Sequence, residues 1–101
     1  MIESWGCYIM TPEDYVANAD ELTVAAQEDA FENWFNILSK TEEWGFDGLS
    51  FAEHHFMPDS MIPSPHLVIA ALIGQTSKLR FTTAGSVLSL HHGWRYAAEV
   101  A

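Results

Sequence analysis

The sequence is poor in basic residues, in cysteine and in long apolar runs. Four of its 101 residues are Lys or Arg and 14 are Asp or Glu, so the formal net charge is −10. This acidity disfavours binding to nucleic acid or to an anionic membrane surface, because both partners carry negative charge. The single cysteine, Cys7, excludes an internal disulfide and therefore a secreted disulfide scaffold. Its place in an apolar segment predicts a small, buried side chain.

The sequence also shows no secretory signal and no apolar run long enough to span a membrane. The longest apolar run, residues 67–73, is much too short to cross a bilayer. The first residues, Met-Ile-Glu-Ser-Trp, lack the basic region and apolar core of a secretory signal. We therefore expect a cytoplasmic protein without a membrane partner. Hydrophobic residues form 49% of the chain, which is typical of a folded domain and excludes general disorder.

Short apolar segments alternate with segments of helical periodicity along the chain. The pattern predicts three strands, over residues 5–10, 48–53 and 79–88. It predicts three helices, over residues 28–44, over residues 65–76 and from residue 94 onwards. Ser64 as N-cap and Pro65 at the first helical position mark one helix start, and Gly45 marks one helix end. This repeated strand–helix order predicts an α/β fold with parallel strands and right-handed crossovers.

The segment Gly-Leu-Ser-Phe-Ala-Glu-His-His, residues 48–55, is the most informative part of the sequence. Because alternate side chains of a strand point to opposite faces, Leu49 and Phe51 share the face suited to packing under helices. His54 then lies with small residues on the other face, and Glu53 and His55 point away from it. Reactive groups gather at the carboxyl ends of parallel strands, and histidine changes its protonation near neutral pH. The cluster therefore predicts an enzyme site.

Several motifs carry a resemblance to a known family. They are Glu-Glu-Trp-Gly-Phe-Asp at 42–47, Glu-His-His-Phe at 53–56, Pro65 with the small-residue helix after it, Thr-Ser-Lys-Leu-Arg at 76–80, Thr-Ala-Gly-Ser-Val-Leu at 83–88, and Arg95 with Glu99. In this order and spacing they resemble the amino-terminal part of the bacterial luciferase-like flavin-dependent monooxygenases. The resemblance covers roughly residues 28–101. The family usually has proline where this chain has Ser89 and Gly93, which leaves the conformation of that loop open.

The resemblance implies a (β/α)8 TIM barrel, of which this chain would supply the first three β-α units. The chain has 101 residues, whereas such a barrel needs about 250. The final helix also has no stop signal, so we expect residues 1–101 to be the amino-terminal part of a single, longer domain. The resemblance further implies reduced flavin as cosubstrate, with FMN preferred and a deazaflavin as the alternative. Molecular oxygen, a small organic substrate and a homo-oligomeric longer protein are the partners it suggests.

Site residues follow from the same resemblance. His54, the first histidine of the motif, would lie beside the flavin ring and handle protons during oxygen chemistry. Glu53, His55 and the loop residues Ala84, Gly85 and Ser86 are expected to contribute to cofactor binding. The family also has a cis peptide bond at the position of Ala84–Gly85. Its phosphate-binding positions lie on later strands, outside this chain.

Two other functions stay open at this stage. A metal-dependent hydrolase on the same barrel could use a set of ligand-type side chains, namely Glu53, His54, His55, Asp59, His91 and His92. Such barrels commonly carry ligands at the end of the first strand, where this chain has Tyr8 and two apolar residues, so no metal is expected. A non-catalytic binding module could use the acidic residues between 13 and 32, but it leaves the strand-end histidines unexplained. His91 and His92 themselves are expected to be exposed loop residues.

Overall fold

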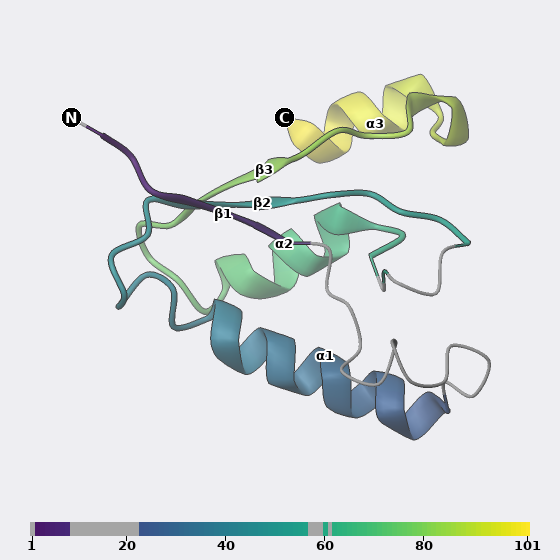
Figure 1. Cartoon of the computed structure of the whole chain (residues 1–101). Coiled ribbons are helices and arrows are strands. Elements are labelled where there is room, and N and C mark those ends of the chain that lie inside the picture. Colours follow the sequence, from purple (N-terminus) through teal and green to yellow (C-terminus); the bar gives the residue numbers. More distant parts are fainter. Residues whose placement is uncertain (1, 9–22, 57–59, 61) are drawn as a thin grey trace.

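The computed structural model describes residues 2–8, 23–56, 60 and 62–101. Its centre is a parallel three-stranded sheet in the order β1-β2-β3 (Figure 1). The strands are β1 (Trp5–Tyr8), β2 (Gly48–Phe51) and β3 (Arg80–Thr83). The predicted α/β class and the parallel strand direction are therefore confirmed.

The helices are α1 (Val24–Leu38), α2 (Pro65–Ile73) and α3 (Gly93–Val100), and a 3-10 turn, η3 (Leu88–Leu90), precedes α3. Figure 1 shows α1 and α2 on one side of the sheet, and α3 next to β3. In the described part of the chain, every helix is too short or too polar to span a bilayer.

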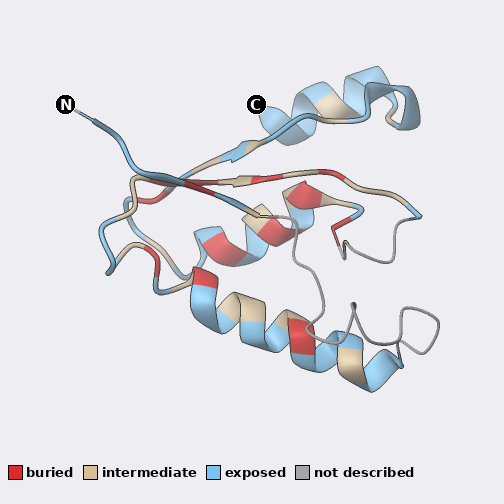
Figure 2. Cartoon of the chain, viewed as in Figure 1, coloured by how far each residue is buried: buried red, intermediate tan, exposed pale blue. Residues whose placement is uncertain are grey.

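The core lies between the sheet and the first two helices, as Figure 2 shows by its buried residues. Its members are buried apolar side chains from each of these layers: Leu38, Leu49, Phe51, Ile62, Val68, Leu72 and Leu79. Half-buried aromatic residues surround them, with Tyr8 and Trp34 in edge-to-face contact at a centroid distance of 5.7 Å. Leu49 and Phe51 are fully buried, so the alternation predicted for the second strand is confirmed at these two positions.

The face of the sheet opposite this core, here called the open face, is more accessible to solvent. Trp5, Gly48 and Arg80 are neighbours across the three strands, and the Arg80 guanidinium lies 5.2 Å from the centre of the indole ring. A Cβ atom on Gly48 would lie 2.4 Å from that indole, so a larger residue would displace the Trp5 ring. Cys7, the next residue of β1 on this face, is exposed. The prediction of a buried thiol is wrong, because helices cover one face of the sheet and not both.

The observed bounds of α1 differ from the predicted ones, because side-chain hydroxyl groups bind the backbone near both ends of the helix. α1 begins at Val24 and not at residue 28, because the Thr23 hydroxyl caps it by accepting from the Ala26 N–H. The helix ends at Leu38 and the chain continues in turns, where the Thr41 hydroxyl donates to the Leu38 carbonyl at 2.7 Å. Gly45 has a φ of +85°, the left-handed conformation predicted for it.

The second helix and the third strand are also shorter than the sequence predicted. α2 begins at Pro65 as predicted, but the Ser64 side chain makes no capping hydrogen bond and the helix ends at Ile73. β3 ends at Thr83, since Gly85 adopts a φ of +97° and turns the chain away from the sheet. Residues 9–10 of the first predicted strand lie outside the described residues.

At the amino ends of the strands, one acidic side chain joins two connections that are distant in the sequence. The Glu42 carboxylate accepts hydrogen bonds from the backbone N–H groups of Ser77 and Lys78 at 2.9 Å and of Leu79 at 3.1 Å. The Lys78 and Ser77 hydrogen bonds hold the pKa of Glu42 below its ordinary value. Glu42 therefore links the turn after α1 to the entry of β3.

Replacing Glu42 with Gln should lower the urea concentration at which the protein unfolds, because a neutral amide binds three N–H groups less strongly than a carboxylate. A depressed pKa means that this stabilisation is present above the ordinary pKa and is lost as the pH falls. The difference between the two proteins should therefore shrink below pH about 4.5. Glu43→Gln, which changes the neighbouring exposed acid, is the matched control. Equal effects of the two substitutions would contradict the role assigned to Glu42.

Candidate functional site

Glu53 lies just beyond the carboxyl end of β2 and continues the alternation of Leu49 and Phe51 toward the core. Its side chain is 0% exposed to solvent. A buried carboxylate is unfavourable unless hydrogen-bond donors replace the water that it loses. The surroundings of Glu53 must therefore supply those donors.

Three groups supply them, and they come from two different loops. His55 Nε2 lies 2.6 Å from Glu53 Oε1, and His91 Nε2 lies 2.9 and 3.0 Å from the two carboxylate oxygens. The backbone N–H of Val87 donates to Glu53 Oε2 at 3.0 Å. Glu53 therefore joins the segment after β2 to the segment between β3 and α3. We call Glu53, His55 and His91 the carboxylate bridge.

The carboxylate of this bridge is ionised at neutral pH. Burial alone raises the pKa of Glu53, but the hydrogen bonds from His55, His91 and the Val87 N–H outweigh burial. Together they lower the pKa from 4.5 to about 2. The bridge therefore holds a buried negative charge whose partners are two imidazole rings and one amide.

Tyr96 of α3 extends the same network to the predicted cofactor loop. Its hydroxyl donates to Ser86 Oγ at 2.5 Å, and Ser86 Oγ donates to Thr83 Oγ1 at 3.2 Å. The Tyr96 ring also contacts the rings of His91 and His66, at centroid distances of 5.0 and 5.2 Å. Ser86 is thus anchored by a helix side chain and by the end of β3.

His54, which was predicted to be catalytic, is half-buried. Its neighbours in the sequence are Glu53 and His55. If the alternation of β2 continues beyond Phe51, the ring of His54 shares the open face with Ser50 and Ala52. Its backbone N–H donates to the carbonyl of Ile62, a fully buried residue, at 3.0 Å. This bond ties the backbone of His54 to the core.

Ala84 and Gly85 lie beside this strand end and are exposed. The Ala84 N–H donates to the Phe51 carbonyl at 2.8 Å, which continues the β2–β3 pairing by one residue. A Cβ atom on Gly85 would meet no atom within 4 Å, so the backbone there borders open space. The expected cis bond at Ala84–Gly85 is absent, since no peptide bond among the described residues is cis. The chain turns at this point through the positive φ of Gly85.

The sequence interpretation missed Tyr96 and the contact of His91 with Glu53, although it named His91 as a ligand-type residue. His91 was expected to be an exposed loop histidine, but its side chain is 21% exposed and bound to Glu53. One signal could have indicated this contact. Glu53 follows Leu49 and Phe51 on the core-facing side, where a carboxylate needs a donor, and the next strand-end loop carries two histidines.

The metal-hydrolase alternative gains no support from the arrangement of these side chains. Within residues 2–8, 23–56, 60 and 62–101, no three His, Cys, Asp or Glu side chains are placed to hold a metal ion. The Nε2 atoms of His55 and His91 are both occupied by Glu53. Asp59, a further candidate ligand, and most of the acidic residues between 13 and 32 lie outside the described residues.

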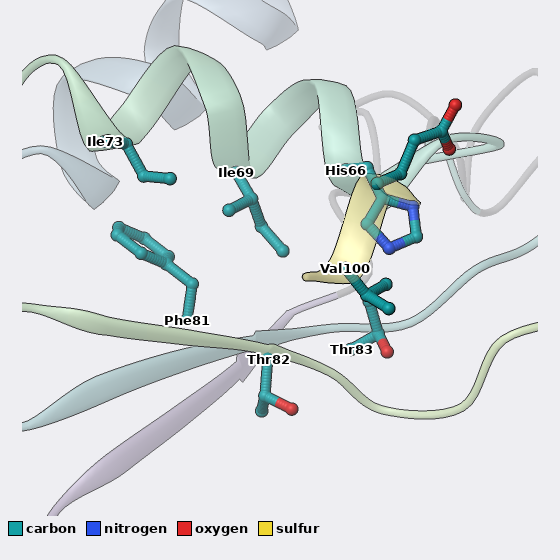
Figure 3. Close-up of a pocket in the computed structure, with 8 residues that line it drawn as sticks. His66, Ile69, Ile73, Phe81, Thr82, Thr83 and Val100 are labelled. Atoms are coloured by element: carbon teal, nitrogen blue, oxygen red, sulfur yellow. The ribbon is translucent and has the colours of Figure 1, made fainter. Parts of the chain in front are cut away.

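A pocket of about 400 Å³ lies elsewhere, between α2, β3 and the end of α3. Figure 3 shows Ile69 and Ile73 of α2 facing Phe81 of β3 across it. His66 also lines this pocket, and its Nε2 atom is buried without a hydrogen-bond partner in the described part of the chain. None of the predicted catalytic or cofactor-binding residues lines it. The pocket nevertheless borders the strand-end network, because Thr83 binds Ser86 and His66 contacts the ring of Tyr96.

The depressed pKa of Glu53 predicts a specific loss of stability in acid. Its stabilising effect is complete above the ordinary pKa of 4.5 and disappears as the pH falls toward about 2; a shift of this size corresponds to roughly 3 kcal/mol. The unfolding free energy of the wild-type protein should therefore exceed that of Glu53→Gln most above pH about 5. Denaturant titrations of both proteins between pH about 3 and 7 measure this difference. A difference independent of pH would show that the charge of Glu53 does not stabilise the fold.

The sequence of the chain is similar to that of known proteins. The model of the luciferase-like monooxygenase family matches residues 13–101. The uncharacterized protein y4vJ of Sinorhizobium fredii is 47% identical over 64 residues, which are 63% of this chain and 18% of that protein. The alkanal monooxygenase alpha chain of Photorhabdus luminescens is 40% identical over 68 residues, 66% of this chain and 19% of that protein.

A third relative extends the match slightly. The alkanal monooxygenase alpha chain of the Kryptophanaron alfredi symbiont is 32% identical over 74 residues, which are 73% of this chain and 21% of that protein. The chain therefore spans about a fifth of the length of these curated relatives. The family match includes β2, β3 and both loops that Glu53 joins, and the chain belongs to the luciferase-like monooxygenase family.

Proposed function

We propose that this chain is the amino-terminal part of a flavin-dependent monooxygenase, and that it supplies the first three β-α units of a (β/α)8 barrel. Family membership and the parallel sheet support the architecture. The relatives named alkanal monooxygenase alpha chain support the oxidation of a small organic substrate by molecular oxygen. Since the chain spans about a fifth of these relatives, further strands would supply the rest of the substrate and cofactor sites.

The open face at the carboxyl ends of β2 and β3 suits a flat ring such as that of FMN. The side chains toward this end are small, with Ser50 and Ala52 beyond Gly48 and with Ala84 and Gly85 beside them. Open space around Gly85 allows close approach of a ligand to the backbone. When bound, reduced flavin supplies the electrons for the reduction of oxygen. Ala84, Gly85 and Ser86 are the residues that we assign to cofactor contact.

His54 is the residue that we assign to proton transfer, and its position carries the proposal. It follows the central strand, whose alternation would put its ring on the open face, and its backbone is fixed by the bond to Ile62. An imidazole ring can hold a proton or release one near neutral pH. Glu53 and His55 support this position from the core side, where they bind each other and the neighbouring loop.

Replacing His54 with Ala in the full-length protein should lower turnover by about 10²–10⁴-fold, the usual contribution of general acid–base catalysis. Flavin affinity should change much less, because the resemblance places the phosphate contacts on other strands. His55→Ala should act mainly through the stability of the loop, since it removes a hydrogen bond to Glu53. Steady-state rates and flavin titrations of both variants measure these effects. Near-normal turnover of His54→Ala together with inactive His55→Ala would show that the two faces are wrongly assigned.

The chain of 101 residues, taken alone, should not bind FMN tightly. It offers one surface for the ring but none of the phosphate contacts that the resemblance places on later strands. Fluorescence titration of the purified chain with FMN tests this expectation. Submicromolar binding by the chain alone would contradict the partial-barrel proposal.

A further inference from the structure

The carboxylate bridge constrains the chemistry of two histidines besides His54. Both His55 and His91 approach Glu53 with the same ring atom, Nε2, at 2.6 and 2.9 Å from Oε1. The second carboxylate oxygen accepts from the Val87 N–H at 3.0 Å. Three groups therefore converge on one buried carboxylate.

We propose that Glu53 is a positioning residue that fixes the tautomer of both histidines, with the hydrogen on Nε2 and Nδ1 left as the acceptor. The proposal deepens the proposed function, because it assigns a role to the rings next to the predicted catalytic histidine. It makes His55 and His91 acceptors for water or for a ligand hydroxyl or N–H group at the strand-end site.

The tautomers follow from what each group can donate. An ionised carboxylate has acceptor oxygens and no hydrogen, so any ring nitrogen bound to it must carry one. A neutral imidazole has a single ring hydrogen, and in both rings that hydrogen is on Nε2. The opposite tautomer would place two lone pairs against each other in a buried site, which is unfavourable because both groups are left unpaired.

The same geometry determines where each ring can take up a proton. Nε2 already carries a hydrogen and is bound to Glu53, so an incoming proton bonds to the Nδ1 lone pair. The imidazolium that forms keeps its bond to the carboxylate, which balances its charge without any movement of the loop. The side chains of His55 and His91 are 24% and 21% exposed, so water reaches both rings.

Glu53 also controls the predicted cofactor loop through the same contacts. Val87 and His91 lie on either side of η3, and both bind Glu53. Ser86, next to Val87, is held by the hydroxyl of Tyr96. A change in Glu53 therefore alters the tautomers of two rings and the position of residues 86–91 together.

The first experiment measures the tautomers directly and needs neither flavin nor turnover. The full-length protein is labelled with ¹⁵N in histidine, and the ring nitrogens of His55 and His91 are assigned from His55→Gln and His91→Gln. At a pH high enough for neutral rings, long-range ¹H–¹⁵N spectra should show both rings with the hydrogen on Nε2. A neutral wild-type ring with its hydrogen on Nδ1 would overturn the proposal and would leave the proposed function untouched.

The second experiment changes the charge and keeps the shape. Glu53→Gln has one carbonyl oxygen and an amide that donates, so it cannot accept from three donors, and at least one ring should move its hydrogen to Nδ1. Turnover should fall about 10–100-fold, by analogy with the partners that orient metal-bound histidines. Glu53→Asp, which retains the charge, should keep the wild-type tautomers and recover part of the rate.

Glu32→Gln, on the exposed side of α1, is the control for the loss of one negative charge and should match the wild type. If Glu53→Gln does not fold, the wild-type spectra and Glu53→Asp decide the question. Wild-type tautomers and turnover in Glu53→Gln would show that the carboxylate does not position the rings. If His54→Ala is also fully active while the tautomers agree, the proposed function fails and the positioning role stands.

Discussion

The buried charge of Glu53 is the constraint on which the arrangement of the strand-end site depends. Among the described residues, the side chains bound to it are two histidines and neither lysine nor arginine. Its side chain is fully buried, whereas the pairs Arg95–Glu99 and Arg80–Glu3 are largely exposed. Exposed pairs contribute about 0–1 kcal/mol, while a buried charge without its donors is strongly unfavourable. The two loops that supply these donors must therefore be in place before the site is stable.

The side chains of β2 alternate between the two faces of the sheet. This alternation would separate the buried carboxylate of Glu53 from the proposed proton transfer by His54. Leu49, Phe51 and Glu53 are buried on the core side, whereas alternation along the chain would put Ser50, Ala52 and His54 on the opposite side. One segment would therefore fix both loops through Glu53 and still present a histidine on the open face. The ring of His54 does not need to serve as a structural partner of Glu53, because His55 and His91 fill that role.

Local patterns predicted the elements of this fold better than their lengths or their contacts. The helix start at Pro65 and the left-handed Gly45 follow from backbone preferences that act within a few residues, so the sequence shows them directly. The exposed Cys7 could not be predicted from its apolar neighbours, because its exposure depends on what covers the sheet. The contact between Glu53 and His91 spans 38 residues, and no local periodicity carries information about it.

The loop between β3 and α3 illustrates how such a distant contact can replace a local one. The family usually restricts this loop with prolines where the chain has Ser89 and Gly93, and proline stabilises a loop chiefly by limiting the unfolded chain. Here folded-state contacts act on the same segment: Val87 and His91 bind Glu53, and Tyr96 binds Ser86. Two of these contacts end on the same carboxylate, so the order of the loop depends on the ionisation of Glu53. The restriction that proline imposes on φ is independent of charge, whereas the two contacts to Glu53 weaken when that carboxylate is neutralised.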